Sequence, residues 1–173
     1  RYIYAALPQT QAAGLDALRR ELAQRKAQGG APRVEILGLP SGWQNASMVL
    51  GLENTLGYNP LRISAYARAV GPGENAVDPN SRKFPGTFRG YMCELAQLLG
   101  IEYLVLDRPL AKLPRHVPRP AVSQVFAAEG MYVYRLRRAA PRAYLATSVK
   151  PVAVDDAIAA RSLPPIDRTR EAL

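Results

Sequence analysis

The strongest constraint on the fold is a pair of apolar runs separated by a short turn. Residues 124–127 and 131–136 are strand-like, and they flank Ala128-Glu129-Gly130. That spacing, with its glycine, is typical of a β-hairpin. A hairpin requires at least one antiparallel strand pair, so the sequence predicts a sheet that is not purely parallel.

Helical and strand-like segments alternate along the rest of the chain. Leu15, Leu18 and Leu22 form an apolar stripe that predicts a helix over 10–28, and Gly29-Gly30 ends it. The run 101–106 is apolar and short enough to be a buried strand. The other predicted helices are 59–70, 88–99 and 154–161, and the other predicted strands are 33–37 and 142–149.

This order of elements predicts an α/β (α+β) fold, with one mixed sheet of about five strands and helices packed on it. We expect residues 1–173 to form a single soluble domain, with a basic, proline-rich connection at 108–120 and a tail at 164–173. The chain opens at Arg1 and stops at Leu173 within a polar segment. We therefore expect it to be excised from a larger protein.

The chain is strongly basic, with a formal net charge of +9 and all but four of its 23 basic residues arginines. Such a domain can bind nucleic acid, anionic lipid head groups or sugar phosphates. The alternative is a solvated, arginine-rich surface without a specific partner.

Signatures of catalysis are missing from the sequence. It contains no phosphate-binding glycine loop, no H-E-x-x-H and no CxxC, so we expect no cofactor and no metal. Cys93 and His116 are the only cysteine and histidine, which excludes a conventional His/Cys zinc site within the chain. A hydrolase or transferase that uses carboxylates is a further hypothesis, with candidates at Glu53, Glu94, Glu102 and Asp107.

Several short motifs occur in the order found in one family of membrane proteins. Residues 57–61 read GYNPL, with Tyr66 beyond them, and residues 98–105 read LLGIEYLV. Tyr132-Val133-Tyr134 is followed by PRAY at 141–144, and Arg33-Val34 follows the first predicted helix. In these motifs the chain resembles the YfhO family of bacterial multi-pass membrane proteins.

The resemblance implies a context. Members of that family look like GT-C-type glycosyltransferases, with many membrane helices and a soluble domain outside the cytoplasm near the C-terminus. It implies polyprenyl-phosphate sugars as donors and cell-envelope glycans or lipids as acceptors. The catalytic acid of such enzymes belongs to a loop between early membrane helices. We therefore expect this chain to be a non-catalytic domain on the periplasmic side of the bacterial inner membrane, partnered by the membrane-embedded remainder of its own chain.

Six residues are candidates for contact with a glycan or an anionic lipid: Trp43, Asn45, Tyr58, Asn59, Arg115 and Arg142. An aromatic face beside amides, as at Trp43 and Asn45, has the composition of a carbohydrate platform. The alternative for the tryptophan is a core or loop anchor with its N–H hydrogen-bonded. Tyr58 and Asn59 have the same ambiguity, since they also suit a turn and a helix cap.

A basic nucleic-acid-binding module is the alternative function. It would need exposed aromatics interleaved with the arginines. Here the aromatics fall mostly at core-periodic positions, such as Tyr91, Tyr103 and Tyr134, so we expect no nucleic acid.

Overall fold

The computed structural model describes residues 9–55, 63–71, 80, 82–83, 88–113, 122–137, 139, 141, 143–160, 163–167 and 170–173. Its helices are α1 (Gln9–Ala27), α2 (Ala46–Leu50), α3 (Ser64–Val70), α4 (Glu94–Leu98) and α5 (Val154–Ala159), with 3-10 turns η1 (Ser41–Asn45) and η3 (Leu110–Lys112). Its strands are β1 (Arg33–Leu37), β2 (Ile101–Leu106), β3 (Val122–Ala128), β4 (Met131–Leu136), β5 (Ser148–Val149) and β6 (Glu171–Ala172).

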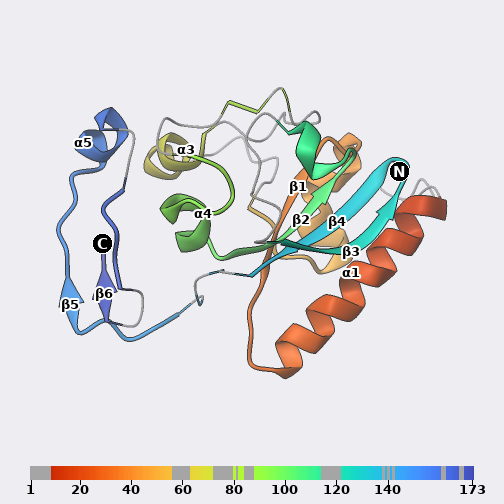
Figure 1. Ribbon diagram of the computed structural model, residues 1–173, viewed down its shortest axis with the longest axis horizontal. Helices are drawn as coiled ribbons and strands as arrows, with labels where there is room; N and C mark the ends of the chain where they lie inside the picture. Colours follow the sequence, from red (N-terminus) through yellow and green to blue (C-terminus); the bar gives the residue numbers. More distant parts are fainter. Residues whose placement is uncertain are drawn as a thin grey trace.

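The main sheet has four strands in the order β1-β2-β4-β3 (Figure 1). Strand β1 runs parallel to β2, while β4 is antiparallel to both of its neighbours. The predicted hairpin is therefore confirmed as β3 and β4, and so is the mixed α+β class. The sheet is one strand smaller than expected because the fifth candidate pairs elsewhere.

Helix α1 covers one face of the sheet and packs on β3 and β4 (Figure 1). Leu15, Leu18 and Leu22 are buried there against Tyr103 and Met131 from the strands, as the apolar stripe predicts. The helix ends because Gly29 adopts φ 79°, a conformation that favours glycine. The Gly29 and Gly30 amides then donate to the carbonyls of the last helical turn, which have no partner within the helix.

The opposite face is covered by the segment before β2. The sequence predicted one helix over 88–99, but the helix α4 is much shorter and begins only at Glu94. Gly90 lies at φ 104°, which no right-handed helix contains, so the chain turns there. Phe88 and Tyr91 are buried nonetheless, with their rings edge to face at 5.1 Å. The spacing of the apolar residues in 88–99 therefore correctly indicates that Phe88 and Tyr91 are buried, but not that they lie on a helix.

Residues 142–149 were predicted as a strand, and this was wrong for most of the segment. Only Ser148–Val149 form a strand, β5, and it pairs with β6 in a separate two-stranded sheet. These two short strands lie apart from the main sheet (Figure 1). The tail predicted at 164–173 therefore ends in an ordered pairing, in which the amides of Thr147 and Ser148 donate to the carbonyl of Arg170.

Two other segments are described only in part. The helix predicted over 59–70 starts at Ser64, and Ile63 before it is extended at φ −71° and ψ 111°, so a continuous helix from Asn59 is not formed. Within the connection predicted at 108–120, Leu110 and Leu113 are buried around η3. The earlier part of that connection is therefore anchored to the core.

Candidate functional site

One hollow on the described part of the chain lies beside β1, the edge strand of the sheet. Its volume is about 590 Å³. We call it the Tyr66 hollow, and it is lined by Arg33, Gly51, Leu52, Glu53, Asn54, Thr55 and Tyr66. The segment after α2 forms one wall because it pairs with the strand: the Val34 amide donates to the Glu53 carbonyl at 2.7 Å, and the Thr55 amide donates to the Val34 carbonyl at 3.2 Å.

Thr55 connects this hollow to a buried ion pair. Its hydroxyl donates to the carboxylate of Glu35, in the middle of β1. The guanidinium of Arg82 lies 3.0 Å from the same carboxylate, and the two side chains are only 3% and 1% exposed. Arg82 also donates to the Val70 carbonyl at the end of α3. The ion pair therefore joins β1 to the C-terminal end of α3. Its two opposite charges are buried together, away from water.

The buried carboxylate of Glu35 affects the pKa of two tyrosines. Burial, followed by the nearby carboxylate of Glu35, raises the pKa of Tyr66 above its usual value. The same causes raise the pKa of the fully buried Tyr91 further. Both phenols are therefore neutral at physiological pH. The Tyr66 hydroxyl donates to the Thr55 carbonyl at 3.1 Å, which fixes its ring beside the hollow.

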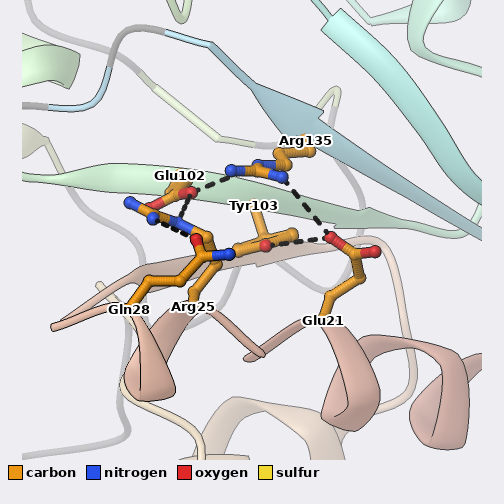
Figure 2. A network of polar contacts seen from close by, with 6 residues as sticks. All are labelled: Glu21, Arg25, Gln28, Glu102, Tyr103 and Arg135. Carbon is orange, nitrogen blue, oxygen red and sulfur yellow. Dashed lines mark hydrogen bonds and ion pairs between the residues drawn. The ribbon is translucent and has the colours of Figure 1, made fainter. Parts of the chain in front are cut away.

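A second polar cluster lies where the C-terminal end of α1 meets the sheet (Figure 2). Glu102 of β2 accepts from Arg25 of α1 at 2.5 Å and from Arg135 of β4 at 3.2 Å. Arg135 also lies 3.8 Å from Glu21, and Glu21 accepts from the Tyr103 hydroxyl at 3.2 Å. The hydrogen bond to Glu102 is the main reason that the pKa of Arg25 is raised. This network ties the helix to two strands.

A smaller hollow of about 360 Å³ opens next to this network. We call it the arginine hollow, and it is lined by Arg25, Glu102, Ser123, Arg135, Leu136, Arg137 and Ala139. Neither hollow was foreseen from the sequence. A signal did exist for the buried ion pair that Thr55 connects to the Tyr66 hollow, since Glu35 interrupts an apolar strand at a position that the fold buries.

Two of the six predicted contact residues lie in the described structure. Trp43 is 2% exposed and packs in the core beneath α1, where its indole N–H donates to Gln11 at 2.9 Å. This is the anchor arrangement that the sequence left open as the alternative to a sugar platform. Asn45 is partly exposed at the end of η1. The structure does not place either residue in the two hollows.

The other four predicted contact residues, Tyr58, Asn59, Arg115 and Arg142, lie outside the described residues.

The carboxylates considered for catalysis are dispersed. Glu53 lines the Tyr66 hollow and Glu102 lines the arginine hollow. Asp107 pairs with its neighbour Arg108 at 2.9 Å, and Glu94 lies in the first turn of α4. None of these four is brought together with another at either hollow, so these candidates do not form a carboxylate pair there that could share a substrate.

No family model, curated protein or solved structure matches this chain. Among the described residues, no three His, Cys, Asp or Glu side chains gather as a metal site. The same residues contain no helix with the length and apolarity needed to cross a bilayer.

Proposed function

We propose that this chain is a non-catalytic, glycan-contacting domain of a larger membrane protein, and that the Tyr66 hollow is its contact surface. The observation that carries the proposal is the aromatic ring of Tyr66, 44% exposed at the rim of a hollow lined by amide, hydroxyl and charged side chains. A ring with one apolar face and polar neighbours suits a sugar, which has both apolar C–H faces and hydroxyl groups.

The position of the Tyr66 ring favours binding because it is already fixed. The hydroxyl is held by the Thr55 carbonyl, and Thr55 in turn is held by the Val34 carbonyl and by Glu35. A ligand that stacks on a preorganised ring orders fewer side chains on binding, which lowers the entropic cost of association.

The two buried carboxylates are engaged in contacts within the protein, which argues against their use in catalysis. Glu35 interacts with Arg82 and Thr55, and Glu102 interacts with Arg25 and Arg135. Each carboxylate therefore joins two or more elements of the fold. A general acid or base would instead need a geometry open to a substrate proton.

The membrane context of the proposal comes from the resemblance to the YfhO family. In the proposed context, the domain lies on the periplasmic side of the bacterial inner membrane, attached to a membrane-embedded part that resembles a GT-C glycosyltransferase. That part would use a polyprenyl-phosphate sugar, and this domain would contact the envelope glycan or lipid that is modified.

A glycan array on the purified chain tests the binding proposal. We expect saturable binding to an envelope glycan that is lost in Tyr66→Ala and weakened but still measurable in Tyr66→Phe, which keeps the ring and loses the hydrogen bond that fixes it. Tyr144→Ala is the matched control. The Tyr144 hydroxyl also donates to a backbone carbonyl, that of Glu171, but this tyrosine lies in the segment near the C-terminus and not at the Tyr66 hollow. Binding that survives Tyr66→Ala, or no binding to any glycan, would refute the assignment of the hollow.

The membrane context has a separate test. Reporter enzymes that are active only outside the cytoplasm, fused after Leu173 in the full-length protein, should be active. A cytoplasmic location of the fusion point would refute the membrane context and leave the glycan assignment untouched.

The nucleic-acid alternative rests on the net charge of +9. Against it, three aromatics that single-strand binding could use, Tyr91, Tyr103 and Tyr134, are buried in the core. Binding of single-stranded oligonucleotide that weakens steeply with salt would revive this alternative.

A further inference from the structure

Among the described residues, positive charge exceeds negative charge around the arginine hollow. Arg25, Arg135 and Arg137 line it, and Glu102 is the one carboxylate among its described lining residues. Glu21 reaches Arg135 from the side of α1, at 3.8 Å. Even when both carboxylates are counted against the three guanidinium groups, one positive charge remains.

Donors remain available within the hollow. The Nε–H groups of Arg25 and Arg135 both donate hydrogen bonds to the carboxylate of Glu102. Within the part of the chain that the structure describes, no hydrogen bond or ion pair involves the exposed Arg137 side chain or the Ser123 hydroxyl. A guanidinium carries five N–H donors, so Arg137 and the outer edge of Arg135 present a set of donors to the hollow.

These donors are placed by strand pairing. Ser123 of β3 is the register partner of Arg135 in β4, and Arg137 follows directly at the end of β4. Arg135 is also held in place by ion pairs with Glu102 and Glu21, as Figure 2 shows. A guanidinium that is already held in place loses less freedom when it binds an anion.

We infer that the arginine hollow is a binding site for a phosphate-type oxyanion, with Arg137, Arg135 and Ser123 as its donors. Guanidinium groups bind phosphate through paired, charge-assisted hydrogen bonds, which makes this ligand class the best fit to the lining. The volume of about 360 Å³ admits a phosphate group with a small substituent. The inference uses other residues than the Tyr66 hollow and does not depend on the glycan proposal.

The oxyanion has two possible sources, a soluble phosphate ester or a lipid head group, and two probes separate them. The first is inorganic phosphate, titrated into the labelled chain while NMR follows the backbone amides of Ser123 and Arg137 and the guanidinium resonances. The second is sedimentation with phosphatidylglycerol vesicles, compared with phosphatidylcholine vesicles.

Arg137→Gln is the test variant, and Arg170→Gln is its matched control. Both remove one positive charge from an exposed side chain, but Arg170 directly precedes β6 and is not among the residues that line the arginine hollow. We expect Arg137→Gln to weaken binding about tenfold, as the loss of a charge-assisted hydrogen bond would. The control should change binding less than about twofold, because screening limits distant charges.

The outcomes decide both the site and the source. Saturable, Arg137-dependent shifts with inorganic phosphate support a site for soluble phosphate esters. Arg137-dependent binding to anionic vesicles without those shifts supports a head-group site. If neither probe binds, or if the two variants lose binding equally, the inference is overturned, because only non-specific attraction to a basic protein would remain.

Discussion

Two ion pairs in this protein have the same nitrogen–oxygen distance and opposite environments, and they should therefore differ widely in strength. Arg82–Glu35 and Arg68–Asp155 each join a guanidinium nitrogen to a carboxylate oxygen at 3.0 Å. The first pair has side chains 3% and 1% exposed, and the second 57% and 80%. At that distance the Coulomb attraction is roughly 5.5 kcal/mol at an effective dielectric constant of about 20, and roughly 1.4 kcal/mol in bulk water before screening.

Double-mutant cycles on the free energy of unfolding measure this difference. The acid-to-amide and arginine-to-methionine changes are made singly and together: Glu35→Gln with Arg82→Met, and Asp155→Asn with Arg68→Met. We expect a coupling energy of about 3 kcal/mol or more for the buried pair, since breaking such a pair strands a charge in the interior. For the exposed pair we expect less than about 1 kcal/mol.

Urea denaturation at two salt concentrations provides the assay and a control. The exposed coupling should shrink further at about 1 M salt, where the Debye length falls to about 3 Å, whereas the buried coupling should hardly change. Equal couplings for the two pairs, or a buried coupling that salt abolishes, would refute the reasoning that burial sets the strength.

Two further predictions concern the packing of the core. Gly14→Ala should destabilise the protein by on the order of 1 kcal/mol despite the higher helix propensity of alanine, because the new Cβ would lie 2.5 Å from the Sδ atom of the buried Met131. Chemical denaturation should show no comparable loss for Gly42→Ala, where the new Cβ would meet no atom within 4 Å beyond its own neighbours in the chain. Because burial raises the pKa of Tyr91 and Tyr103, the neutral phenols stabilise the fold below pH about 10, and this stability is lost as the pH rises towards their raised pKa values. In an alkaline titration, absorbance at 295 nm should therefore show these phenols ionising together with unfolding, and smooth ionisation of all nine tyrosines in the folded state would contradict this.

Local signals in the sequence were sufficient where an element depends on its own residues. The hairpin of β3 and β4 follows from a turn of fixed length with Gly130 in it, and the end of α1 follows from Gly29. The buried strand β2 was predicted with its observed bounds, Ile101–Leu106, because every residue in it is buried. These features need no knowledge of distant partners.

The same signals failed where burial and local conformation diverge. The spacing of Phe88 and Tyr91 fitted a helix, yet Gly90 turns the chain and the rings are buried without one. Trp43 had the neighbours of a sugar platform, but the arrangement of α1 over the sheet buries its ring. A periodic pattern records which side chains avoid water, and several backbone paths can bury the same set.

The sequence by itself determined the kinds of element and the mixed character of the sheet, because turn length, glycine conformation and apolar spacing act within a few residues. Only the tertiary structure decided the sites. The Glu35–Arg82 pair and the Arg25–Glu102–Arg135 network join residues 47, 77 and 33 positions apart in the chain, and their proximity exists only once strand order and the position of α1 are set. Charged side chains carry no periodic signal for such partners, since electrostatic attraction depends on distance in space and on burial rather than on separation along the sequence.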